Sequence, residues 1–145
     1  MRKLIPVIAF LTLMIACTDE QLATVSKSLL ASAKSIGIVQ TTVIQAEKQG
    51  TISEDSCRAI LEGCVKANQA GLQAVEITRT ISKLDPVSRQ QMTPLVQAAL
   101  SSIQANLMLD LTSVKNEQTR AAITSGLTTA QTLLTVALTT LQSGG

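Results

Sequence analysis

Cysteine, carboxylate and lysine side chains are the groups of this chain that could do chemistry, because its 145 residues include no histidine. Without imidazole, the usual general acid–base group and a common zinc ligand are both missing. A serine nucleophile would need lysine as its base, and no serine stands three residues before a lysine. Neither a GxGxxG nor a Walker sequence is present to bind phosphate. We therefore expect no catalytic residues, no cofactor and no metal, and we expect that the protein is not an enzyme.

The carboxylates have structural explanations. Glu54 and Asp55 stand where a helix is expected to begin, and acids in a first turn stabilise the positive end of the helix dipole. Glu62 precedes Lys66 by four residues, which is the spacing of a surface ion pair worth about 0.2–0.5 kcal/mol. These acids indicate helix stability rather than acid–base catalysis.

Cys57 and Cys64 are seven residues apart and fall on one face of an expected helix. At 1.5 Å per residue their α-carbons would be about 10.5 Å apart, whereas a disulfide tolerates about 7 Å. We expect both to lie in the core as small apolar side chains. A break in the helix at Gly63 would allow a bridge. No CxxC pattern indicates a redox or zinc site.

The first seventeen residues have the layout of a secretory signal. Two cations, Arg2 and Lys3, precede an apolar run from Leu4 to Ala16, and Cys17 follows. The run is too short for a spanning helix, which needs about 20 apolar residues, and Pro6 argues against a continuous helix there. We expect a signal peptide over residues 1–16 that is removed from the mature protein.

Residues Met14 to Cys17 resemble the lipobox of bacterial lipoproteins, in which a small residue and the lipidated cysteine close the signal; Ala16 and Cys17 match this pattern. The resemblance implies cleavage before Cys17 and acyl chains on that cysteine. These chains would anchor the protein to a membrane without a spanning helix. Cleavage without lipidation, which would leave a free secreted domain, is the alternative.

Cleavage of the signal would leave a mature chain with neither a net positive charge nor an aromatic side chain. Without Arg2 and Lys3, ten cations balance ten acids, so no basic field remains to attract phosphate backbones. The single aromatic residue, Phe10, lies in the signal, so base stacking is missing as well. We expect no nucleic-acid partner.

The remaining residues, 17–145, are expected to form one helical domain. Apolar residues recur at spacings of three and four, the repeat of helices that pack side by side. The expected helices cover residues 20–49, 53–83, 86–111 and 117–142. At Pro94 either a short helix ends or one helix kinks, and we favour one kinked helix. The apolar stripes expected to face the core are Leu22, Val25, Leu29, Ser32, Ile36, Val39, Val43 and Ala46; Cys57, Ile60, Leu61, Cys64, Leu72, Val75 and Ile81; Val96, Ala99, Leu100, Ile103, Leu107 and Leu111; and Ile123, Leu127, Ala130, Leu134, Ala137 and Leu141.

Helix starts are marked by capping residues. Ser53 is suited to cap the second helix, with Ile52 packing on Cys57, and Thr51 with Glu54 offers a competing capping box. Asp85 before Pro86 is suited to begin the third.

The last helix carries no charge from Ala121 onward, but its many threonines make it less apolar than a normal membrane span. We expect a bundle helix.

Together these patterns predict an all-α protein, an antiparallel four-helix bundle with up-down topology behind a signal peptide. We expect a non-catalytic envelope lipoprotein with a structural or protein-interaction role, exported and held by Cys17 on a bacterial membrane facing the periplasm or the outside. An envelope protein or a second copy are the partners left open. The alternatives are a carrier of a lipid or small apolar ligand and a phage-type membrane-active protein.

Overall fold

The computed structural model describes the backbone of residues 5–144 and the side chains of residues 20–144. The predicted signal peptide therefore lies partly outside the described residues. The elements, in chain order, are α1 (Ile5–Lys48), α2 (Glu54–Thr80), α3 (Pro86–Leu107), the short 3₁₀ turn η1 (Leu111–Ser113) and α4 (Glu117–Gln142). No strand occurs among residues 5–144, and the predicted all-α class is confirmed.

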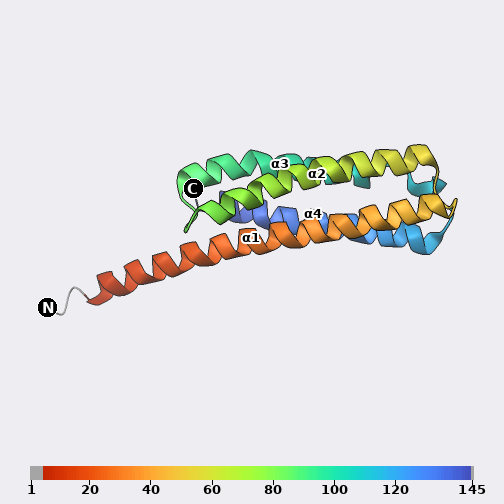
Figure 1. Ribbon diagram of the computed structural model, residues 1–145. Coiled ribbons are helices and arrows are strands. Elements are labelled where there is room, and N and C mark those ends of the chain that lie inside the picture. Colours follow the sequence, from red (N-terminus) through yellow and green to blue (C-terminus); the bar gives the residue numbers. More distant parts are fainter. Residues whose placement is uncertain (1–4, 145) are drawn as a thin grey trace.

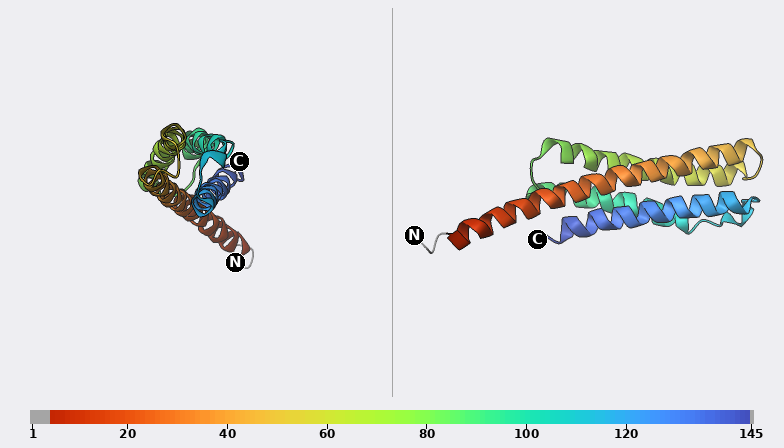
Figure 2. Two further views of the ribbon diagram at one scale, coloured as in Figure 1. Left: turned by 90° about the vertical axis from the view of Figure 1, so that its right-hand side faces the viewer. Right: turned by 90° about the horizontal axis from the view of Figure 1, so that it is seen from below.

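The four helices pack side by side as an up-down bundle (Figure 1). Each helix packs on its chain neighbours, and α4 returns to α1, where the contact is most extensive. Viewed along its length, the bundle is a four-cornered ring of helices (Figure 2). One end holds the α1–α2 turn and the α3–α4 connection. The other holds the α2–α3 connection and the C-terminus, and α1 continues past the bundle at that end.

α1 begins earlier than the sequence indicates. We expected its start near Glu20, whereas the helix begins at Ile5 and joins the apolar run to the bundle without a break. The run contains good helix formers and no stop signal, and Pro6 stands in the first turn, where its missing N–H has no intrahelical partner to lose. The argument from Pro6 against a continuous helix was therefore wrong for this uncleaved chain.

Side-chain caps begin the other helices. Ser53 accepts a hydrogen bond from the backbone N–H of Ser56, Asp85 from that of Ser88, and Asn116 from that of Thr119. The predicted caps at Ser53 and Asp85 are thus confirmed, and Ser53 prevails over the competing box at Thr51. Each cap satisfies one of the N–H groups that a first turn leaves without a partner.

Two helices end earlier than predicted. α2 ends at Thr80 rather than at residue 83, because Ile81 is extended and the chain turns so that Leu84 is buried. α3 runs through Pro94 as one helix but ends at Leu107, four residues before the predicted end.

The segment after α3 is shaped by local polar contacts. Asp110 caps η1, and Val114 is completely buried under the bundle end. The backbone N–H of Lys115 donates to the carbonyl of Thr51, 2.9 Å away, which joins the α3–α4 connection to the α1–α2 turn.

The core is formed by heptad stripes from all four helices. The predicted stripe of α4 is confirmed in every member, and that of α1 is confirmed except for Leu22, which is partly buried. In α3 the buried stripe begins earlier than predicted, at Ser88, and ends at Asn106. Leu100, Leu107 and Leu111 lie beside the core, only partly buried.

The buried face of α2 differs most from the prediction. Leu72 was expected in the core but is 49% exposed. The predicted members Cys57, Ile60, Cys64 and Val75 are buried, and Leu61 and Ile81 are partly buried. The small residues Ala67, Gly71 and Ala74, which our prediction passed over for larger apolar ones, complete the buried face together with Thr78.

Candidate functional site

Cys17, the predicted lipidation residue, lies in the backbone of α1 three residues before Glu20, and its side chain is outside those described. The helix containing it leaves the bundle beside the C-terminal end of α4 (Figures 1 and 2). We call the end formed by the start of the α1 bundle segment, the α2–α3 connection and the end of α4 the anchor end.

Arg89 closes the anchor end. Its guanidinium donates to the carbonyl oxygens of Thr140 and Leu141 at 2.9 and 3.0 Å, and to the side-chain oxygen of Gln21. Three helices are therefore joined by one side chain: α3 supplies the cation, α4 its last carbonyls and α1 the amide. Gly144 lies so close to the guanidinium that a Cβ there would overlap it.

The surroundings explain how a cation tolerates this site. Arg89 is only 8% exposed, and no carboxylate pairs with it among the described residues. The final carbonyls of a helix carry the negative end of its dipole and have no intrahelical partner, so they suit a cationic donor. Arg89 thus gives a charged donor to the carbonyl of Leu141 and to that of Thr140, which also accepts from the hydroxyl of Ser143.

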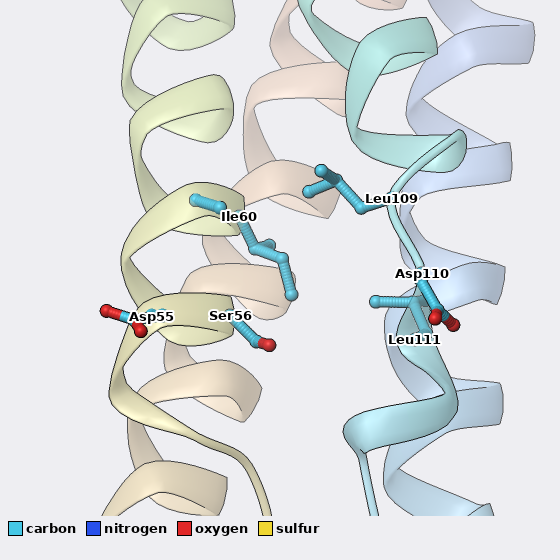
Figure 3. Close-up of a pocket in the computed structure, with 7 residues that line it drawn as sticks. Asp55, Ser56, Ile60, Leu109, Asp110 and Leu111 are labelled. Atoms are coloured by element: carbon cyan, nitrogen blue, oxygen red, sulfur yellow. The ribbon is translucent and has the colours of Figure 1, made fainter.

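A groove runs between α2 and α3 at the opposite end of the bundle. One depression of about 210 Å³ is lined by residues including Ser56, Ile60, Leu109 and Leu111. A neighbouring one of about 400 Å³ is lined by Glu62, Lys66, Ser101, Ser102 and Asn106 together with Ala59, Gly63, Ala105 and Leu109. In Figure 3 the side chains of α2 face Leu109 and Leu111 across the first depression, while Asp55 points away from it.

The acids at this groove remain structural. Asp110 accepts a hydrogen bond from the backbone N–H of Thr112 at 2.9 Å, and bonds from Thr112 lower the pKa of its carboxyl. Asp55 stands in the first turn of α2, as expected. Because the two carboxylates point in different directions (Figure 3), they do not form an acid–base pair.

Asn106 is the polar centre of the α2–α3 contact. It is 3% exposed, and its amide donates to the carbonyl of Ile60 at 2.9 Å and to the Cys64 sulfur at 3.6 Å. Its side chain rests against Gly63, where any Cβ would overlap it. The α2 backbone at Gly63 therefore approaches α3 as closely as this amide allows.

Cys57 and Cys64 are free and buried, as predicted, and the helix is unbroken at Gly63. Burial raises the pKa of Cys64 to about 11, against a smaller opposing effect of the hydrogen bond from Asn106. Burial, followed by the charge of Glu47, also raises the pKa of Cys57. Since the thiolate is the reactive form, neither thiol is activated.

The expected ion pair between Glu62 and Lys66 is not formed. The ion pairs among the described residues are Arg58–Glu54 and Arg79–Glu76, both well exposed. Glu62 and Lys66 instead line the groove beside α3. An exposed pair at this spacing is worth so little that local surroundings decide whether it forms.

Sequence reasoning missed the two polar residues that organise the ends of α3. Arg89 and Asn106 occupy the same heptad stripe as Met92, Val96, Ala99 and Ile103. Their place in this heptad stripe could have revealed them, because a polar residue in a core position must form hydrogen bonds with buried partners.

No protein-family model, curated protein or solved structure matches the chain. Among residues 20–144, no three His, Cys, Asp or Glu side chains gather closely enough to hold a metal ion. The segments Glu20–Lys48 and Glu117–Gln142 are long and apolar enough to cross a membrane by length and composition. In the bundle each buries its apolar stripe against the other helices.

Proposed function

We propose that this protein is a non-catalytic lipoprotein of the bacterial envelope, which presents a rigid helical bundle at a membrane surface. Acyl chains on Cys17 would be its membrane anchor, and its role would be structural or in protein interaction. The lipobox resemblance of Met14 to Cys17 supplies the chemistry of the anchor.

The observation that carries the proposal is the short distance from Cys17 to the bundle. Gln21 follows Cys17 by four residues of α1, a rise of about 6 Å, and its side chain is bonded to Arg89. An acylated Cys17 would therefore hold the anchor end at the lipid headgroups with no flexible linker. The bundle would stand on that end, with its long sides available to other proteins.

The test is the intact mass of the protein purified from a bacterial membrane fraction, beside the Cys17→Ser variant. We expect a diacyl or triacyl mass on a chain that begins at Cys17, lost in the variant. Cys57→Ser is the matched control, because that buried thiol has no part in anchoring and its replacement should leave the lipid mass and the membrane fraction unchanged. An unmodified mature chain in the soluble fraction would refute the proposal and favour the free secreted domain.

The carrier and membrane-active alternatives stay predictions with tests of their own. A carrier should retain a stoichiometric amount of non-covalently bound lipid in the Cys17→Ser variant, which has no acyl chains of its own. A membrane-active protein should release dye from vesicles. The buried apolar stripe of α4 does not favour the membrane-active alternative.

A further inference from the structure

An apolar strip runs along the outside of the α1–α2 pair. Eight large apolar residues are exposed within residues 20–144, and four of them lie in this strip. The exposed apolar side chains are therefore gathered here rather than scattered singly over the surface. The strip comprises Leu30, Ile44, Val65 and Leu72, which are 38–49% exposed, together with the half-buried Leu61. Gly37 stands midway between Leu30 and Ile44 at heptad spacing, and the space around its missing Cβ is open.

The sides of α1 and α2 that pack on α4 and α3 show where the strip lies. The strip residues are on the other side of each helix, where α1 and α2 border each other. On α1, the hydroxyl of Ser35 donates to the carbonyl of Gly126 in α4, so the edge on the far side of Ser35 borders α2. On α2, Gly63 rests against α3, so the edge on the far side of Gly63 borders α1. At 100° per residue the strip residues fall on these far edges.

Polar rows flank the strip at the same heptad spacing; the row on α1 carries lysines and the row on α2 carries two acids. The row on the outer face of α1 is Lys27, Lys34, Thr41 and Lys48, and the row on the outer face of α2 is Glu62, Gln69 and Glu76. Glu62 and the neighbouring Lys66 line the groove toward α3, so Glu76 is the acid of this row that serves the strip. None of the three lysines has an ion-pair partner among the described residues. Flanking rows of this kind set partner choice and orientation in helical assemblies.

We propose that the apolar strip is the contact surface for a second copy of this chain, in parallel orientation about a two-fold axis along the bundle. Such an axis places α1 of one copy over α2 of the other, so Lys27 of each copy comes opposite Glu76 of the other. The short turn at Gly50 puts Lys27 and Glu76 at about the same height, since they lie 23 and 26 residues from it. An antiparallel pairing would instead bring α1 onto α1, lysines against lysines.

The exposed arginines beside the strip do not oppose this pairing. Arg58 and Arg79 are each joined to an acid of their own helix, Glu54 and Glu76, at solvent-exposed positions. Exposed pairs exchange partners at little cost. Glu76 can therefore contact a partner's lysine without losing a strong interaction.

The size of the strip predicts how the dimer depends on the membrane. From Leu30 to Ile44 it is about 21 Å long, and two helices are about 20 Å wide, which gives roughly 400 Å² per copy. Stable complexes bury about 800 Å² per partner. Tethering on one membrane would raise the effective concentration and hold both copies with the same end down. The parallel orientation thus rests partly on the proposed function.

Disulfide trapping in membranes tests the pairing. Gly37→Cys and Val65→Cys are made in separate full-length chains, one carrying a size tag, and the two are co-expressed; the native Cys57 and Cys64 are buried and unactivated. We expect mild oxidation to give a disulfide between the two chains, with little of either homodimer. Absence of the mixed dimer, or a dominant Gly37→Cys homodimer, would overturn the inference.

Surface variants in both chains then test the strip and the charges. Leu72→Lys should lower the mixed dimer at least tenfold, whereas Val136→Lys, at a similarly exposed site on α4, should leave it unchanged. Lys27→Glu should weaken trapping and added Glu76→Lys should restore it. Equal effects of the Leu72 and Val136 changes would refute the surface.

The mass of Cys17 in the same sample separates the two proposals. Lipidated chains without the mixed dimer would refute the interface alone. Mixed dimer without lipid would refute the anchor and support the strip.

Discussion

Replacing two helix glycines by alanine gives opposite results if the α2–α3 contact is as described. Gly37 and Gly63 both lie inside helices, where alanine is favoured by about 0.8–1.0 kcal/mol. A Cβ at Gly37 meets nothing within 4 Å, so Gly37→Ala should stabilise the bundle by about that amount. A Cβ at Gly63 would overlap the side chain of Asn106.

The cost at Gly63 follows from what Asn106 must give up. Moving its amide breaks the hydrogen bond to Ile60, worth about 1 kcal/mol, and leaves buried polar groups unpaired, at about 1–3 kcal/mol. Setting this loss against the gain in helix propensity leaves Gly63→Ala destabilising by about 1–3 kcal/mol. The two alanine variants should therefore differ by about 2–4 kcal/mol in free energy of unfolding.

Urea unfolding followed by circular dichroism measures both values in a chain that begins at residue 17 and carries Cys17→Ser. Adding Asn106→Ala to Gly63→Ala removes the overlap, so the double-mutant cycle should show a favourable coupling above about 1 kcal/mol. Equal midpoint shifts in the two glycine variants, or strictly additive effects of Gly63 and Asn106, would refute the described contact.

Three further predictions concern the anchor end, the thiols and the caps. Arg89→Met removes a charged donor from two carbonyls and an amide, and should cost about 1.5–3 kcal/mol. The rate of backbone hydrogen exchange should then rise in the last turn of α4, and an unchanged exchange pattern would contradict the role of Arg89 in holding this end of the bundle. Cys64, with its pKa raised to about 11, should react very slowly with a thiol reagent at pH 8 and faster in urea; rapid labelling of the folded protein would count against its burial. Hydrogen bonds from Ser88 lower the pKa of Asp85 below its ordinary value of 3.8, so its contribution to stability is present above that pH and is lost as the pH falls through the lower, folded value. Asp85→Asn, which keeps a capping side chain, should flatten this acid dependence of the unfolding midpoint, and an unchanged dependence would exclude Asp85 as its source.

The proposed lipid anchor rests on the sequence of residues 1–17 alone, whose side chains lie outside those described. The rest of the candidate site was partly predictable. Spacing predicted that Cys57 and Cys64 cannot be bridged within an unbroken helix, and only the structure excluded the break at Gly63 that would have allowed a bridge. Arg89 escaped prediction because its partners at Gln21 and Leu141 are 68 and 52 residues away along the chain.

Local pattern therefore determined the number of helices, the starts of α2, α3 and α4, and the stripes of α1 and α4. Heptad spacing and capping act within one or two turns, so neighbouring residues suffice to specify them. Tertiary structure alone decided that α2 turns small residues inward and leaves Leu72 outside, and that Asn106 presses on Gly63. The physical reason is that core volume and buried polar partners are shared among helices, and no single helix carries the information on how that space is filled.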